Sequence, residues 1–542
     1  MYNYVFLCYL INRFNNKLIF RTCLEMSKFK DLLQLTTFVS FNKILLFFCH
    51  KSTEFTSNNK LLVLIQNVPI RNWYLEQNRC MLNKPPLFVY FQYILSIFVA
   101  FINKGVISEE HFQSVQTVYF QRFTVVLLDI VLALSAFKWS RYLCLLNYDR
   151  RVSMLLIIFS NCGLFLVDHL SFGYNGLMMG IFLLSIYYIA IENECIGVFL
   201  YAVLLNLDLN FLYPAPALIV YLLRNYCIDQ RKFNLVKFLQ LVFIFCSVFL
   251  ASFGPFALNF QQVIKSVFSR KKTYARFFWG PNFWEFYKLI DFLVFAKTKD
   301  NFLEENFTIS YLNESQLVHN YYYLPPIFPE ITFLLVFLSI FPCLYKLFTA
   351  SNSSTDLKTK GIKLVRSVQV CSFCCFMFGW NVEKKSILIV ILPSLLLAFY
   401  GSYNDKVLFF VLQYIGHYSL FPLFTSQFAV LLRFLMWSLY SLLCFKFVLT
   451  RSYLDVKTEP SRSFGIRTFL MIMYLFTLLF NEVFCNIIFP LTSLAEKYSL
   501  LPLMLNSACC SIGFIVCFLY AYKLMFVNEY CSEISNVNFK DK

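Results

Sequence analysis

Long apolar runs alternate with short polar segments over most of the 542 residues of this chain. Two of the runs, Leu155–Val167 and Leu177–Ile191, lie on either side of the polar pair Asp168-His169. A membrane-spanning helix needs roughly 17–25 mostly apolar residues, and about fourteen stretches of the chain approach that length. The pattern therefore predicts an all-α, polytopic integral membrane protein with about 11–14 transmembrane helices.

The composition supports a membrane protein. Hydrophobic residues make up 59% of the chain, charged residues only 14%, and the mean hydropathy is +0.62. A soluble protein of this size needs far more charge on its surface. The net charge of +17 comes from basic residues that lie mostly in loops, which indicates topology and contact with lipid rather than nucleic acid. The 19 cysteines fall mostly in apolar runs and show no metal-ligand spacing, so we expect buried thiols and no metal site.

The basic segments predict which ends of the spans face the cytosol, because loops rich in Lys and Arg stay on that side. With residues 1–30 as a basic cytosolic segment, residues 31–527 form the multi-span domain and 528–542 a cytosolic tail. The segment Leu87–Ile102 follows Pro85-Pro86 and is expected to lie in the interface without crossing. The alternation then places these basic residues in the cytosol: Lys138, Arg141, Arg150, Arg151, Arg224, Arg231, Lys232, Lys237, Lys358, Lys360, Lys363, Arg366, Arg451, Lys457, Arg462 and Arg467.

The same alternation gathers several polar clusters on the opposite side. They are Glu54 and Asn83 in a loop at about 50–116, the pair Asp168-His169, and Asn381–Lys385. Taken singly, each cluster could be an ordinary helix end or a charged turn. The long segment of about 257–329 also lies on this side although it is basic, with Lys265, Arg270, Lys271, Lys272 and Arg276. Such a loop could be tolerated because long loops translocate regardless of charge, or it could bind phosphate or pyrophosphate.

An enzyme that acts on a lipid-borne substrate needs this arrangement. The lipid tail lies between helices, and its polar head meets side chains at the helix ends. A carboxylate there can act as general base for an incoming hydroxyl. Cationic side chains and helix N-termini can hold a leaving phosphate.

Three segments resemble one family, the endoplasmic-reticulum glucosyltransferases that use dolichyl-phosphate glucose. Val167–Gly176 is similar to the family block V-D-H-x-x-F-Q-Y-N-G, Trp279–Trp284 to W-A-P-N-F-W, and Phe378–Leu388 to F-G-W-H-V-H-E-K-A-I-L. They follow one another in the family's order. The Tyr-Asn-Gly and Pro-Asn-Phe-Trp forms resemble the branch that adds the second glucose.

This resemblance implies a GT-C type fold in the endoplasmic-reticulum membrane with a luminal active site. The implied reaction is an inverting transfer of glucose from dolichyl-phosphate glucose to the 3-hydroxyl of a monoglucosylated, dolichyl-pyrophosphate-linked oligosaccharide in N-linked glycosylation. It needs no other cofactor and no metal. The implied roles are Glu54 as catalytic base and Lys384, Lys385 and Arg276 as ligands of the donor phosphate. The implied acceptor and sugar contacts are Asp168, His169, Tyr174, Asn175, Trp279, Asn282 and Trp284.

The chain departs from the family pattern at several of these positions. The family's aspartate in Ser-Thr-Asp-Phe is Glu54, its Asp-Tyr before Pro-Pro is Asn83-Lys84, and its glutamine is Gly173. Both histidines of the third block and its aligned glutamate are replaced, whereas Lys385 is retained. The alternatives are therefore a first-glucose transferase, a catalytically decayed homologue, and a lipid or solute transporter.

Overall fold

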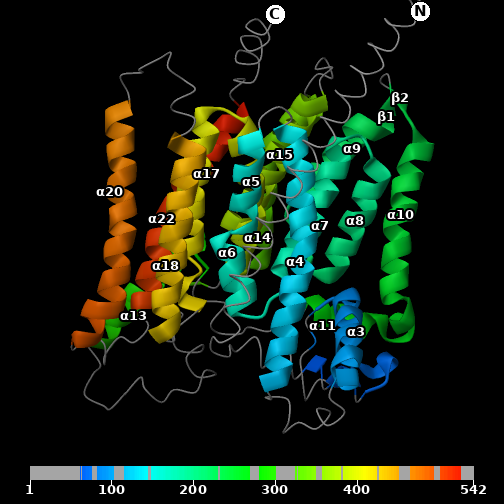
Figure 1. Ribbon diagram of the computed structural model, residues 1–542, viewed down its shortest axis with the longest axis horizontal. Helices are drawn as coiled ribbons and strands as arrows, with labels where there is room; N and C mark the ends of the chain where they lie inside the picture. The colour runs from blue at the N-terminus through cyan, green and yellow to red at the C-terminus, as the bar shows by residue number, and fades with distance from the viewer. Residues whose placement is uncertain are drawn as a thin grey trace, which may run out of the picture.

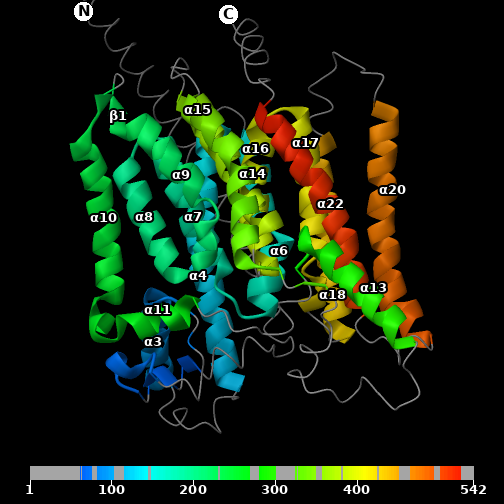
Figure 2. The ribbon, with the colours of Figure 1, turned by 180° about the vertical axis from the view of Figure 1, so that it is seen from behind.

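The chain folds into a bundle of helices in the computed structural model shown in Figures 1 and 2. The structure describes residues 61–62, 64–66, 68–75, 82, 84–102, 115–144, 148–229, 232–268, 280–300, 324–325, 327–349, 357–379, 382–423, 427–450, 464–492 and 501–526. Three predicted site residues, Glu54, Arg276 and Trp279, lie outside this set, as do Asn83 and Asn381. Their predicted roles are not tested by the structure.

The first part of the bundle runs from residue 70 to residue 300. Its helices are η2 Ile70–Asn72, α3 Pro86–Ile102, α4 Val115–Leu143, α5 Tyr148–Phe159, α6 Cys162–Leu164, the π-helix η3 Phe165–Leu170, α7 Asn175–Ala190, α8 Glu194–Leu207, η4 Leu209–Leu212, α9 Ala215–Leu222, η5 Leu223–Cys227, α10 Leu235–Phe253, η6 Gly254–Asn259, α11 Phe260–Phe268 and α13 Trp284–Asp300. The strands among the described residues are β1 Ile228–Asp229 and β2 Lys232–Phe233, an antiparallel pair in which Ile228 faces Phe233.

The second part begins at residue 329. Its helices are α14 Pro329–Thr349, α15 Leu357–Phe378, η8 Lys384–Ile387, α16 Leu388–Tyr400, α17 Tyr403–Tyr418, η9 Phe421–Leu423, α18 Gln427–Cys444, η10 Phe445–Thr450, α20 Phe464–Val483, η11 Phe484–Ile488, η12 Phe489–Leu491 and α22 Leu501–Phe526.

Eight helices of the described residues are long and apolar enough to cross a membrane, and three further apolar helices are shorter. The polytopic, all-helical architecture expected from the sequence is confirmed. The number of 11–14 spans stays a prediction, because length and composition alone do not decide how the shorter helices are placed.

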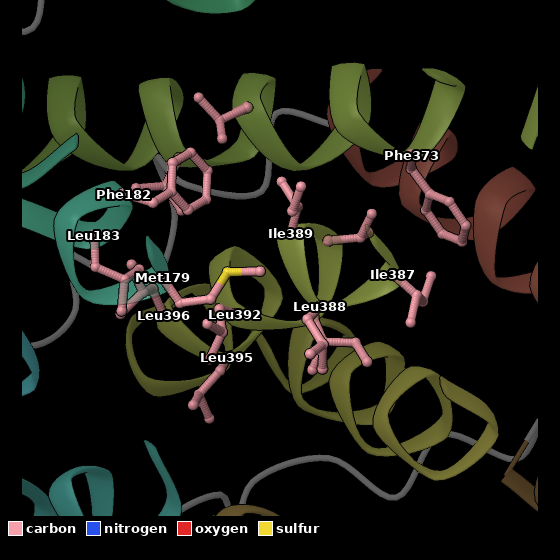
Figure 3. Close-up of a cluster of buried hydrophobic side chains, with 14 of the residues drawn as sticks. Met179, Phe182, Leu183, Phe373, Ile387, Leu388, Ile389, Leu392, Leu395 and Leu396 are labelled. Carbon is pink, nitrogen blue, oxygen red and sulfur yellow. The ribbon is translucent and has the colours of Figure 1, made fainter. Parts of the chain in front are cut away.

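The centre of the bundle is a continuous apolar core. Figure 3 shows Met179 and Phe182 of α7 facing Ile389 and Leu392 of α16, with Phe373 of α15 nearby. The peripheral helices differ, because they present large apolar side chains outward: Phe243 of α10 is 74% exposed, Phe333 of α14 73%, Leu442 of α18 66% and Phe480 of α20 64%. A helix surface of this kind is stable against lipid rather than water.

The two ends of the bundle are distinct in both views. The β1–β2 hairpin lies at the upper end, whereas α3, α11 and α13 lie at the lower end (Figures 1 and 2). The segment predicted to lie in the interface, Leu87–Ile102, forms α3 there beside α11. The segment of about 257–329, expected to be a loop, contains two helices, α11 and α13. Helix α11 forms because Val263 and Val267 recur at helical spacing and are both buried.

The apolar run Leu155–Val167 is not one continuous α-helix. Helix α5 ends at Phe159, and Asn161 starts a short new turn whose Leu164 N–H donates to the Asn161 Oδ1 at 3.0 Å. The Asn161 Nδ2 donates to the Tyr440 hydroxyl of α18 at 3.3 Å. This break turns the chain into the π-helix η3, which carries Asp168 and His169.

Candidate active site

The carboxylate of Asp168 is buried and holds the start of α7. It accepts hydrogen bonds from the N–H of Asn175 and from its Nδ2, both at 2.8 Å, and from the N–H of Gly176. The N-terminus of a helix has free N–H donors and a partial positive charge, so a carboxylate there is stabilised. These contacts are those of a group that orders a helix end, whereas contact between Asp168 or Asn175 and a sugar hydroxyl stays a prediction.

The neighbouring His169 joins η3 to α4. Its Nε2 lies 2.9 Å from the Oδ2 of Asp129, and both side chains are buried. Ionisable groups in membrane helices are costly unless they are paired. Asp129 lies in the apolar span Val118–Leu143, and it supplies the partner that the sequence left unidentified for His169.

The turn between η3 and α7 explains one departure from the family pattern. Phe172 has a φ of 64°, and its buried ring lies 4.7 Å from the guanidinium carbon of Arg122. A Cβ placed on Gly173 would lie 2.6 Å from the Asn175 Nδ2, 2.7 Å from the Asp168 Oδ1 and 2.8 Å from the Val167 carbonyl oxygen. The turn in this conformation therefore requires glycine where the family has glutamine.

Tyr174 is a buried contact between helices rather than an exposed aromatic. Its ring packs edge-on against Phe91 of α3 with centroids 5.1 Å apart, and its hydroxyl lies 3.4 Å from the Thr124 Oγ1 of α4. Only 7% of Tyr174 is exposed. The block predicted from Val167–Gly176 thus ties α3, α4 and α7 together.

The second and third family-like blocks are in direct contact, although about a hundred residues separate them. The N–H of Phe283 donates to the Met377 carbonyl oxygen at 3.3 Å, and the Trp284 Nε1 donates to the Phe378 carbonyl oxygen at 3.1 Å. Asn282 is buried at this junction. Its Oδ1 caps the N–H of Trp284, and its carbonyl oxygen accepts from the Ser511 Oγ of α22 at 2.7 Å.

Lys384 lies on the α13 side of the short helix η8. Its electrostatic neighbours are Glu285, which is 2% exposed, and Lys288, whose Nζ lies 3.9 Å from the Glu285 Oε2. Neither α13 nor η8 is among the candidate spans. Burial raises the pKa of Glu285 to about 7, against the opposite effect of the two lysines, and burial lowers the pKa of Lys384 to about 8, against the opposite effect of Glu285. This cluster can therefore take up or release a proton near neutral pH.

Lys385, the next residue, has different neighbours. Its Nζ lies 3.6 Å from the Glu383 Oε2, and that same oxygen accepts from the Asn210 Nδ2 at 3.0 Å. The N–H of Asn210 donates to the Asp208 Oδ1 at 3.0 Å, and the Asp208 Oδ2 lies 3.5 Å from the Lys84 Nζ. The two lysines predicted to share the donor phosphate thus belong to separate clusters.

Five residues of these clusters were not among the predicted site residues: Lys84, Asp129, Asp208, Asn210 and Glu285. Asp208 and Asn210 follow the apolar helix α8 and come shortly before Pro214, so the alternation of spans already places them on the side of Asp168. A polar pair at the end of an apolar run was the available signal. Glu285 directly follows the block Trp279–Trp284 and could have been found by its position.

A metal centre is not evident in the part of the chain that the structure describes, where no group of three or more His, Cys, Asp or Glu side chains could hold an ion. The groups gathered at the lower end are amines, carboxylates and amides. Such groups bind phosphates and sugars.

Comparison with known proteins agrees with this site. The profile of the ALG6, ALG8 glycosyltransferase family matches residues 39–521. The chain is 29% identical to the dolichyl pyrophosphate Glc1Man9GlcNAc2 alpha-1,3-glucosyltransferase of Dictyostelium discoideum, with 94% of this chain and 96% of that protein covered. It is 31% identical to the protein of the same name in Bos taurus, over 89% of this chain and 93% of that one. The probable enzyme of that name in Drosophila melanogaster is 32% identical, over 89% and 92%. The chain belongs to the ALG6, ALG8 glycosyltransferase family.

Proposed function

We propose that this chain transfers glucose from dolichyl-phosphate glucose to the monoglucosylated, dolichyl-pyrophosphate-linked oligosaccharide, forming the α-1,3 linkage of the second glucose. The relatives quoted above carry names for this acceptor, Glc1Man9GlcNAc2 on dolichyl pyrophosphate, and they match almost end to end. Their names favour the second glucose over the first.

The observation that carries the proposal is the junction of the second and third family-like blocks. Trp284 and Phe283 bind the end of α15, and the third block continues from there into Glu383, Lys384 and Lys385. This junction lies at one end of a bundle whose peripheral helices are suited to lipid. A substrate with a polyprenyl tail and a phosphate head fits both properties.

The proposed reaction is a single displacement. The 3-hydroxyl of the terminal glucose attacks C1 of the donor glucose, the C1–O bond to the phosphate breaks, and dolichyl phosphate leaves with that electron pair. The hydroxyl proton passes to a carboxylate, for which Glu54 is the proposed base. Negative charge grows on the leaving phosphate, so cations at that point lower the barrier.

Lys385 is the proposed main ligand of the donor phosphate, with Arg276 beside it. Lys384 lies among Glu285 and Lys288 and is assigned to the edge of the same polar surface. Trp279, Asn282 and Trp284 shape the acceptor side through their position at the α13–α15 junction. The proposed location is the endoplasmic-reticulum membrane with this end of the bundle in the lumen.

Mass profiling of dolichol-linked glycans tests the proposal. Cells that lack their own second-glucose transferase accumulate the monoglucosylated species, and expression of this chain is expected to convert it to more highly glucosylated species. The Glu54→Gln variant, expressed to the same level, is expected to leave the monoglucosylated species unchanged. Absence of conversion by the wild-type chain at normal expression would support a decayed homologue and overturn the proposal.

A further inference from the structure

We propose that the turn Asp208–Asn210 between α8 and α9 positions two lysines, Lys385 and Lys84, for binding one phosphate group. Asn210 acts through Glu383 on Lys385, and Asp208 acts directly on Lys84. The inference rests on the proposed function only for the identity of the phosphate, which is that of dolichyl phosphate as donor headgroup and leaving group.

The contacts that support this proposal come from three separate parts of the chain. Lys84 precedes α3, the turn Asp208–Asn210 follows α8, and Glu383 and Lys385 follow α15. The turn is fixed by its own hydrogen bond, since the Asp208 Oδ1 caps the N–H of Asn210 at 3.0 Å. It then makes one contact to each neighbour, Asp208 to Lys84 at 3.5 Å and Asn210 to Glu383 at 3.0 Å. Segments 124 and 173 residues apart are thereby held in one register.

The exposure of the four charged side chains shows which of them can reach a ligand. The carboxylates are the more buried members, with 8% of the Asp208 and 14% of the Glu383 side chain exposed. The amines above them are more open, at 28% for Lys84 and 20% for Lys385. A lysine ammonium has three N–H donors, so contact with one carboxylate leaves capacity for a phosphate oxygen.

The charges of the cluster suit a phosphate that gains charge during reaction. Two lysines and two carboxylates balance without ligand, which lowers the cost of burying them. The donor headgroup is a phosphodiester, and the leaving dolichyl phosphate is a monoester with an additional ionisable oxygen. The lysines therefore interact more strongly with the product-like transition state than with the donor, and this is the requirement for catalysis.

Binding of dolichyl phosphate to the purified full-length chain tests the proposal. Short-chain dolichyl phosphate is titrated against the wild type and the Asn210→Leu variant, with short-chain dolichol as the probe that lacks the phosphate. We expect the Kd for dolichyl phosphate to rise roughly tenfold in Asn210→Leu, as for a lost hydrogen bond to a charged group, and the affinity for dolichol to stay constant. Lys84→Met is expected to weaken the same affinity by a similar factor.

Asn225→Leu is the matched control. It removes another asparagine Nδ2 hydrogen bond, to the Tyr221 carbonyl oxygen in the α9–η5 helix, and is expected to leave both affinities unchanged. Equal loss of dolichol and dolichyl phosphate affinity in Asn210→Leu would show a general structural defect and overturn the proposal. Unchanged affinity for both would overturn it as well.

A double variant separates this inference from the proposed function. If Asn210 acts through Lys385, then Asn210→Leu added to Lys385→Met weakens dolichyl phosphate binding no further than Lys385→Met alone. Additive losses would contradict the route through Glu383. Dolichyl phosphate binding that depends on Asn210 in a chain that transfers no glucose would retain the phosphate site and reject the transferase, whereas glucose transfer unaffected by Asn210→Leu would do the reverse.

Discussion

The Asp168 and Lys385 clusters use similar residues and differ in what they leave exposed. Asp168 and His169 are 2% and 5% exposed, and their contacts are the first turn of α7 and Asp129 of α4. Lys385 and Lys84 are several times more open and stand above buried carboxylates. The comparison teaches that charge at a helix end is not in itself a sign of ligand binding. The first cluster holds helices together, and the second presents amines outward.

Removal of the Asp168 carboxylate should give the largest loss of stability. In Asp168→Ala the N–H groups of Asn175 and Gly176 lose their acceptor inside the bundle, and the free energy of unfolding should fall by about 3 kcal/mol. Thermal unfolding of the detergent-purified protein measures this. The affinity of the remaining folded protein for dolichyl phosphate should stay within twofold of wild type, and a selective loss of that affinity would place Asp168 in the ligand site instead.

A side chain at position 173 should be the next most harmful change. Gly173→Ala puts a Cβ within 2.8 Å of three polar atoms, and overpacking of this kind costs about 2 kcal/mol. Gly254→Ala is the control, since no atom lies within 4 Å of the Cβ it would add. Equal melting temperatures for the two variants would contradict the conformation of the η3–α7 turn.

The pH dependence of donor use should reveal the charge of Lys384. Its pKa is lowered to about 8, so the ammonium is present below that pH and is lost as the pH rises through it. The KM for dolichyl-phosphate glucose should therefore rise up to about tenfold between pH 7 and pH 9, as the difference of one pKa unit implies. In Lys384→Arg the rise should disappear because arginine stays protonated, whereas Lys360→Arg on the exposed Glu192 pair should retain it. A persistent rise in Lys384→Arg would assign the titration to another group.

Loss of a single hydrogen bond at the α13–α15 junction should have the smallest effect. Ser511→Ala removes the donor to the Asn282 carbonyl oxygen and should lower the free energy of unfolding by about 1 kcal/mol. Ser438→Ala, whose hydroxyl contacts only the Leu435 carbonyl oxygen on an exposed helix face, should change stability by less than about 0.5 kcal/mol. A larger loss for Ser438→Ala than for Ser511→Ala would remove the special role of the junction.

The alternation of spans and the family-like blocks could be predicted because both depend on local sequence. Apolar runs of membrane length indicate helices wherever they occur, and successive runs must end on alternate sides. The helical nature of α7, α10 and α15 follows from this reasoning, as does the placement of Glu383–Lys385 on the side of Asp168.

The missed features depend on contacts between distant residues. The break at Asn161 is supported by Tyr440, 279 residues away, and Lys385 is held through Asn210, 173 residues from Glu383. No local pattern identifies such a partner. The inward charge of Asp129 is similar, since one aspartate in an apolar span has no meaning until His169 lies beside it.

The short helix η8 has a consequence for specificity that follows from its geometry. A 3₁₀ helix advances about a third of a turn per residue, so the adjacent amines of Lys384 and Lys385 leave the backbone in divergent directions and meet the separate neighbours described above. A lone headgroup cannot engage both amines unless this turn unwinds. The segment therefore works as a divider between two anion-facing compartments, and inserting one residue before it would exchange their cations.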